Sequence, residues 1–353
     1  MAVEGRPLKD LVKGKRVLCV ATKNLDYIRI RQETHLIREY GGDLTVLGST
    51  AKSYPARLKI VLPGLFRMNK DDFDVIFIGF LPQILIPFFS LLFRGKVVVM
   101  DFFISLYDTL VFDRQRFRQG GLPARFLRWV DRKALRRADH IIADTRTDAE
   151  YFVKELGAAP EKMEVLYLAA DTSIYHPRKV PKPARYRDRF LVLYFGSILP
   201  LQGVETIVEA ANLLKDRSEI AFLLIGPVHA EQKAQASSSH IEFVEWLEQE
   251  KLAEAIATAD LCLAGHFNSR IDKARRTIAG KTYIYRAMGK PVVLGENPAN
   301  RERYKEDGRT IFYTKMGDPS ALRDTILRAW QALSGKEVRC GIRGPEEGND
   351  ESK

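Results

Sequence analysis

Residues 273–293 read KARRTIAGKTYIYRAMGKPVV, and this is the most informative stretch of the chain. It opens with a basic segment, residues 273–281, whose cations are Lys273, Arg275, Arg276 and Lys281. A helix-like segment follows, and a turn at Gly289 and Pro291 then leads into the apolar strand 292–294. Cations that lie directly before a helix inside an α/β domain favour a multiply charged anion, such as the diphosphate of a sugar nucleotide. A solvated basic helix also fits this segment alone, because runs of like charge are usually exposed.

Length and composition restrict the class of protein. The chain has 353 residues, which is enough for two domains of ordinary size. Its three cysteines lie far apart without a C-x-x-C pair, which argues against a disulfide scaffold or a zinc site and suits a reducing cytosol. The start of the chain does not resemble a secretory signal, and the apolar run 81–93 is too short to span a membrane. We therefore predict a cytoplasmic protein.

Short apolar runs alternate with longer helical patterns along most of the chain. In the first half the predicted strands are residues 16–21, 44–47, 75–79, 96–100, 140–143 and 165–168. In the second half they are residues 190–195, 221–225, 241–244, 261–264 and 292–294. Unbroken runs of Val, Ile and Leu between helices indicate parallel sheets that are covered on both faces.

A segment rich in proline and basic residues interrupts this alternation after Tyr175. We predict a first Rossmann-like domain at 1–178, a linker at 179–189, a second Rossmann-like domain at 190–335 and a disordered tail at 336–353. The predicted fold class is α/β, with two doubly wound domains that face a central cleft. In such sheets ligands bind beyond the carboxyl ends of the strands, so we expect functional residues in the loops there.

Several segments together resemble one family of enzymes. In the second half they are FGSILPLQGVETIVEAANLL (195–214), IGP (225–227), ATADLCLAG (257–265) and the stretch 273–293. In the first half they are DFFISLYDTLVFDR (101–114) and ADHIIADTRTDAEYF (138–152). The joint pattern is similar to that of bacterial family-4 glycosyltransferases of the GT-B fold.

This resemblance implies a hexosyltransferase-like enzyme that takes a sugar from a nucleotide-diphosphate sugar with retention of configuration. It implies no cofactor and no required metal. The implied acceptor is a saccharide or a polyprenyl-linked saccharide in the synthesis of cell-surface polysaccharide or glycolipid. In that case the first domain would bind the acceptor and the second domain the donor.

The chain departs from the pattern of the wider family at three places. The Arg and Lys that hold the donor diphosphate in many members correspond here to Ser197 and Gln202, and the glutamate pair of the donor site corresponds to Arg276 and Ile284. The glycine-rich turn after the first strand is replaced by residues 22–24, TKN. We therefore expect the cations of the basic segment to bind the diphosphate instead. An inactive member of the family is the alternative.

The predicted donor-binding residues lie in the second domain. They are Gly196, Ser197, Gly226, Lys273, Arg275, Arg276, Lys281 and Tyr285. Gly196 and Ser197 open a helix whose N-terminus attracts an anion, although Gly196 and Gly226 also fit plain structural roles at strand ends. Lys273 and Lys281 are the predicted catalytic cations, because an ammonium neutralises the charge that develops on the leaving diphosphate.

The predicted acceptor-side residues follow the fourth strand. They are Asp101, Ser105, Asp108 and Arg114. Asp101 comes directly after the strand, and we predict that its carboxylate acts in catalysis by accepting the proton of the acceptor hydroxyl. A plain role for Asp101 as a helix cap is the alternative.

A basic helix predicts contact with a membrane. Arg125, Arg128, Arg132 and Arg136 recur at helical spacing, close in sequence to the apolar segment 84–93. Such a helix can lie on an anionic leaflet, so we predict reversible contact with the inner face of the plasma membrane. A solvated face on a helix that packs against the core fits the same pattern.

Other functions fit parts of the sequence. A nucleotide-sugar 2-epimerase of the same fold would use the same donor site, and a non-catalytic protein that binds nucleic acid or membranes fits the net charge of +11. We predict no nucleic-acid partner, because the chain has no recognisable binding module or interleaved aromatic pattern. A nicotinamide-dependent dehydrogenase is disfavoured, since no G-x-G-x-x-G follows the first strand of either half.

Overall fold

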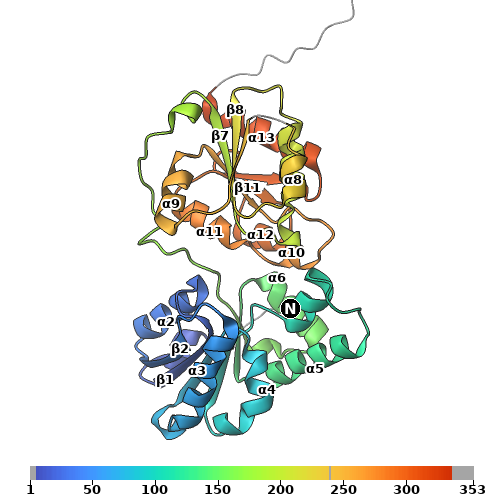
Figure 1. Ribbon diagram of the computed structural model, residues 1–353. Helices are drawn as coiled ribbons and strands as arrows, with labels where there is room; N and C mark the ends of the chain where they lie inside the picture. The colour runs from blue at the N-terminus through green and yellow to red at the C-terminus, as the bar shows by residue number, and fades with distance from the viewer. Residues whose placement is uncertain (1–4, 238–239, 336–353) are drawn as a thin grey trace, which may run out of the picture.

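The computed structural model describes residues 5–237 and 240–335, which form two lobes (Figure 1). Within these residues the first lobe holds a six-stranded sheet in the order β2 (Asp43–Ser49), β1 (Arg16–Asn24), β3 (Val75–Gly79), β4 (Val97–Asp101), β5 (His140–Ala143) and β6 (Met163–Val165). The sheet of the second lobe, also six-stranded in the described part, has the order β12 (Ile311–Thr314), β11 (Val292–Gly295), β10 (Leu261–Gly265), β7 (Phe190–Phe195), β8 (Ile220–Ile225) and β9 (Ile241–Val244). All neighbouring strands are parallel. This confirms the predicted fold class.

Helices connect and cover the strands. In the first lobe they are α1 (Leu8–Val12), α2 (Ile28–Glu39), α3 (Tyr54–Arg67), α4 (Ile86–Phe89), α5 (Leu122–Arg137) and α6 (Arg146–Tyr151). In the second lobe they are α7 (Val204–Asn212), α8 (Ala230–Ala234), α9 (Gln249–Thr258), α10 (Lys273–Arg276), α11 (Gly280–Ala287), α12 (Pro298–Arg303) and α13 (Pro319–Ser334). None of the described helices is both long and apolar enough to span a bilayer.

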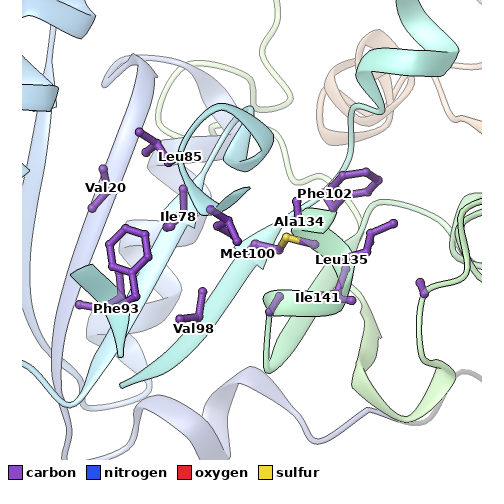
Figure 2. Close-up of a cluster of buried hydrophobic side chains, with 14 of the residues drawn as sticks. Val20, Ile78, Leu85, Phe93, Val98, Met100, Phe102, Ala134, Leu135 and Ile141 are labelled. Carbon is purple, nitrogen blue, oxygen red and sulfur yellow. The ribbon is translucent and has the colours of Figure 1, made fainter. Parts of the chain in front are cut away.

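Each sheet is buried on both faces. In the first lobe, strand residues Ile78, Met100 and Ile141 share one apolar cluster with Ala134 and Leu135 of α5 (Figure 2). A different cluster covers the opposite face of this sheet, and two further clusters cover the faces of the second sheet. Full burial of one large apolar side chain contributes about 1.5–3 kcal/mol, so these clusters hold the strands, and hence the loops at their ends, in fixed positions.

The chain crosses between the lobes after β6. Tyr175 and Tyr186 are both buried in an apolar cluster of the second lobe. The crossing chain therefore packs against the second lobe before residue 178, where we placed the end of the first domain. The division at that residue stays a prediction, and the predicted tail 336–353 lies outside the described residues.

Candidate functional site

The lobes meet at the carboxyl ends of their strands. There α6 and the π-helical segment Asp108–Asp113 of the first lobe contact α12 and α10 of the second (Figure 1). Both α10 and α11 come from the stretch 273–293, so the basic segment lies at this junction. We predicted functional residues in the loops at the carboxyl ends of the strands. The structure brings these loops of the two lobes together.

Glu302 of α12 joins the two lobes. Its carboxylate accepts hydrogen bonds from the backbone N–H of Arg146 at 2.7 Å, from the backbone N–H of Thr147 at 3.0 Å and from the hydroxyl of Tyr167 at 3.0 Å. The first two groups lie at the start of α6, where free N–H groups and the helix dipole favour a negative charge. A side chain of the second lobe thus caps a helix of the first.

Arg276 forms a second link between the lobes. Its guanidinium pairs with Asp108 at 2.9 Å, with Asp148 of α6, and with Asp272 of its own lobe at 2.9 Å. The same group lies 3.6 Å from the ring centroid of Tyr151. The guanidinium of Arg276 is therefore already paired with carboxylates of the first lobe, and the carboxylate of Asp108 is paired with Arg276. The predicted roles of these two residues in donor and acceptor binding stay predictions that the contacts do not favour.

Lys273 reaches across the junction. Its Nζ donates a hydrogen bond to Oγ1 of Thr109 at 3.0 Å. Burial raises the pKa of Asp113 and that of Asp144, which reaches about 6, and the charge of Lys273 opposes both shifts. Lys273 therefore lies close to two first-lobe carboxylates while it remains half-buried at the junction.

Lys281 lies deeper in the second lobe. Its side chain is 6% exposed, and its Nζ donates to the side-chain oxygen of Gln202 and lies 4.7 Å from the ring centroid of Tyr194. Burial lowers the pKa of Lys281 to about 7. No carboxylate among the described residues pairs with this ammonium group. Lys281 is therefore a buried amine without a carboxylate partner in the described part of the chain, and its lowered pKa leaves it only partly protonated near neutral pH.

Two glycines allow Lys281 to approach the end of β7. A Cβ atom on Gly196, whose φ is +151°, would lie 3.0 Å from Cε of Lys281. A Cβ atom on Gly226, whose φ is +146°, would overlap the carbonyl oxygen of Gly196. The ends of β7 and β8 can therefore pack backbone against backbone only because both positions lack a side chain.

His266 is a residue of this site that the sequence interpretation missed. It follows β10 directly, is 4% exposed, and its Nδ1 has no hydrogen-bond partner among the described residues. Burial, together with the charges of Lys281 and Lys273, lowers the pKa of His266 to about 3. The imidazole is therefore neutral, and the two predicted catalytic cations lie close enough to act on the same ring. Its place after a strand end was the available sequence signal.

Asp101 is enclosed in the first lobe. Its Oδ1 accepts from Nη2 of Arg29 at 2.9 Å, and Nε of Arg29 also donates to Glu33 at 3.2 Å. Asp101 is fully buried, and burial together with the charge of Asp101 raises the pKa of Glu33. A carboxylate held in this way stabilises the strand end, and the geometry offers no support for the catalytic role that we predicted.

Asp144 lies at the end of the next strand and was also missed. It follows β5, and its Oδ1 is buried without a hydrogen-bond partner among the described residues. The charges of Arg29 and Lys273 oppose the upward shift of its pKa, so one carboxylate interacts with cations from both lobes. Asp144 therefore interacts with Lys273, a cation at the junction of the lobes.

The other predicted residues have simpler surroundings. The hydroxyl of Ser105 donates to Asp131 at 2.7 Å, which fixes the loop after β4. The hydroxyl of Tyr285, a fully buried residue, accepts from the backbone N–H of Phe195 at 3.1 Å and supports the end of β7. Ser197, Arg275 and Arg114 are exposed. Their predicted roles in binding stay untested. The prediction that Gly196 and Ser197 open a helix was wrong, because α7 begins only at Val204.

Two protein-family models match the chain, one for each lobe. The model described as "Glycosyl transferase 4-like domain" matches residues 17–169, and the model described as "Glycosyl transferases group 1" matches residues 189–332. Among curated relatives, the D-inositol 3-phosphate glycosyltransferase of Nocardioides sp. (strain ATCC BAA-499 / JS614) is 26% identical over 218 residues, which are 54% of this chain and 46% of the relative. The chain spans about half the length of the first curated relatives it matches.

Solved structures share the two-lobed architecture. Sucrose-phosphate synthase from Thermosynechococcus elongatus superposes with a TM-score of 0.65 at 15% identity, over 91% of this chain and 92% of that one. Anabaena HepE, in complex with UDP and glucose, superposes with a TM-score of 0.60 at 15% identity, over 90% of this chain and 89% of that one. At this identity the likeness shows the fold, and the two family models show the relationship. The chain therefore belongs to the glycosyltransferases of the GT-B fold, and the match of its first lobe fits family 4, as the sequence resemblance predicted.

Proposed function

We propose that the chain transfers a sugar from a nucleotide-diphosphate sugar to a saccharide or polyprenyl-linked acceptor, with retention of configuration and without a metal. The observation that carries this proposal is the position of Lys281, a buried ammonium without a carboxylate partner among the described residues, beside the glycines at the ends of β7 and β8. The names of the relatives support a sugar transfer, and the UDP and glucose in the HepE structure support a nucleotide and a sugar as ligands of this fold.

The two lysines would contact the donor from different places. A diphosphate at the end of β7 would contact Lys281, which is buried in the second lobe, and Lys273, which lies at the junction of the lobes. Two ammonium groups that neutralise the leaving diphosphate stabilise the charge that develops as the bond to the sugar breaks. An anion favours the protonated form of a neighbouring amine, so binding of the donor would raise the pKa of Lys281 and draw a proton onto it.

The test begins with a panel of UDP-, GDP- and ADP-sugars, added to the protein in a thermal unfolding assay. We expect at least one of them to raise Tm, because a ligand that binds only the folded chain stabilises it. Release of free sugar and formation of a glycoside are then measured with and without added saccharides. A donor that is only interconverted with its C2 epimer would favour the epimerase, and a panel without any stabilising nucleotide would contradict the proposal.

We also propose that the first lobe contacts an anionic membrane at the inner face of the plasma membrane. Exposed apolar side chains gather on α3, α5 and the segment 86–93, which lie along one side of this lobe (Figure 1). They are Ile60, Phe66, Phe88, Leu91, Leu122, Phe126 and Trp129, between 46% and 82% exposed. A groove of about 720 Å³ along α5 is lined by Trp129 and by Arg125, Arg128, Arg132, Lys133, Arg136 and Arg137.

Apolar side chains surrounded by cations suit a surface with acyl chains below anionic headgroups. Each such cation contributes about 1 kcal/mol of attraction near anionic lipid, which is enough for reversible binding. Flotation with phosphatidylcholine vesicles, with and without phosphatidylglycerol, measures the binding of the protein to anionic lipid. We expect binding only with phosphatidylglycerol, loss of binding in Leu122→Ser with Trp129→Ser, and no change in Trp246→Ser, which alters an exposed tryptophan of the second lobe. Equal flotation of all three proteins would contradict the membrane contact.

A further inference from the structure

Three aromatic side chains form a cluster at the carboxyl edge of the first sheet. Tyr27, Phe80 and Phe103 follow the neighbouring strands β1, β3 and β4. Their ring centroids are 5.9 Å apart for Tyr27 and Phe80, 6.2 Å for Tyr27 and Phe103, and 5.8 Å for Phe80 and Phe103. All three are half-buried, and none belongs to an apolar core of the described residues. The rings therefore leave part of their surface for a ligand.

A lysine lies over this cluster. The Nζ of Lys23 is 5.2 Å from the ring centroid of Tyr27 and 4.9 Å from that of Phe80. No carboxylate among the described residues lies within ion-pair distance of it. Burial lowers the pKa of Lys23, and so does the neighbouring Arg57, whose own guanidinium donates to backbone carbonyl groups. A half-buried cation beside a second cation, with no acid to pair with either of them in residues 5–237 and 240–335, favours an anionic ligand.

The backbone holds the cluster in an unusual conformation. Phe80 and Leu81 have φ values of +56° and +53°, a region that bulky residues rarely adopt. The hydroxyl of Thr22 donates to the carbonyl oxygen of Phe80 and fixes this turn from the end of β1. Strained residues of this kind persist where the surrounding structure holds them, often at binding sites. The ring of Phe80 is thereby held against the other two rings.

One ring of the cluster, that of Tyr27, lies at the junction of the lobes. Tyr27 lines a pocket of about 890 Å³ that also includes Gln249 and Ile284 of the second lobe. The hydroxyl of Tyr27 lies within electrostatic range of Asp144, and Asp144 in turn interacts with Lys273. A ligand that contacts Tyr27 in this pocket would therefore lie on the first-lobe side of the junction.

We infer that Lys23, Tyr27, Phe80 and Phe103 form the acceptor subsite and that the acceptor is an anionic saccharide. Its C–H face would lie on the rings, which offer apolar surface, and its phosphate or carboxylate would bind Lys23. This inference rests on the proposed transfer function, because only a transferase needs a second sugar at this position. A sugar phosphate, a uronic acid and a prenyl-diphosphate-linked sugar all carry the required charge.

Binding without donor tests this inference separately from transfer. The probes are glucose, glucose 6-phosphate, glucuronic acid and a short-chain prenyl diphosphate glucose, titrated into the wild type by calorimetry. We expect at least one anionic probe to bind about tenfold or more tightly than glucose, because a hydrogen bond to a charged group is worth that much. The tightest probe then distinguishes the sources of the anion.

Three variants identify the residues that bind the probes. Lys23→Gln should remove the preference for the anionic probe, and Phe103→Leu should weaken the affinity for glucose and for the anionic probe by a similar factor. Lys13→Gln removes an exposed lysine elsewhere and should change neither affinity. Donor-induced stabilisation should be the same in all three variants. Equal affinity of the wild type for glucose and every anionic probe would overturn the inference, as would a preference that survives in Lys23→Gln. Failure of every nucleotide to stabilise the protein would instead overturn the proposed function.

Discussion

Replacement of Lys281 by methionine separates the charge of this residue from its shape. The side chain is 6% exposed, and methionine fills a similar volume beside Tyr194 and Gly196 without an ammonium group. Loss of one preorganised group that stabilises transition-state charge lowers kcat by about 10²–10³. We therefore expect Lys281→Met to lose sugar transfer and donor hydrolysis by a factor in this range, measured as release of nucleoside diphosphate under saturating donor.

The stability of the same variant gives an independent readout. Burial lowers the pKa of Lys281 from 10.5 to about 7, so between these values the unfolded chain holds a proton that the folded chain releases. The contribution of this residue to the free energy of unfolding therefore rises with pH, by about 1.4 kcal/mol per pH unit. Lys281→Met lacks this slope. It should be at least as stable as the wild type near pH 6, and this gain should shrink at pH 9 in urea denaturation.

Lys315→Met is the matched control, because it removes the charge of a lysine whose side chain is 76% exposed. This variant should keep both the wild-type kcat and the wild-type dependence of stability on pH. Activity of Lys281→Met within twofold of the wild type, in a protein that unfolds cooperatively, would refute the role assigned to the buried ammonium.

Three further substitutions test other contacts. Gly226→Ala should lower the free energy of unfolding by about 1–3 kcal/mol in urea titrations, because the new Cβ is strained and overlaps the backbone at Gly196, and unchanged stability would contradict the packing of β7 on β8. Glu302→Ala should lower the free energy of unfolding by about 0.5–2 kcal/mol, because the cap of α6 is lost, and should split the calorimetric transition into two. A single unshifted transition would show that other contacts hold the lobes together. Asp144→Asn should raise the free energy of unfolding at pH 7 by about 1–3 kcal/mol, because burial raises the carboxyl pKa to about 6 and makes the ionised form costly, and the gain should vanish near pH 4.

The strands were the most predictable part of the fold. β3, β5, β7 and β9 begin and end at the predicted residues, because each is a short apolar run bounded by polar or small residues. β6 lies earlier than predicted: its last residue is Val165, and the next carbonyl, that of Leu166, accepts from Arg29 instead of a strand. β12 was not predicted at all, because the four residues IFYT are too few to stand out from their surroundings.

The site was predictable only where its residues lie in one motif. The basic segment placed Lys273 and Lys281 at the correct edge of the second sheet, since the ends of parallel strands share one edge. The partners of Arg276 were not predictable, because Asp108 is 168 positions away in the sequence and approaches only when the lobes meet. The partner of Asp101 was likewise not predictable, because Arg29 is 72 positions away in the sequence and belongs to α2.

The aromatic cluster shows the same limit. Its rings come from three separate loops that show no common motif, and only the order of β1, β3 and β4 in the sheet brings them together. The glycine-rich turn expected near the end of β1 is absent, and Lys23, which stands in its place, lies over the ring of Tyr27.

A crystal structure of the chain with the nucleotide sugar that stabilises it would locate the donor diphosphate. We predict that the diphosphate lies at the end of β7, with its oxygens at hydrogen-bond distance, about 2.7–2.9 Å, from Nζ of Lys281 and from Nζ of Lys273. A diphosphate bound elsewhere, with Lys281 still donating to Gln202 and Lys273 to Thr109, would show that these two lysines do not bind the donor.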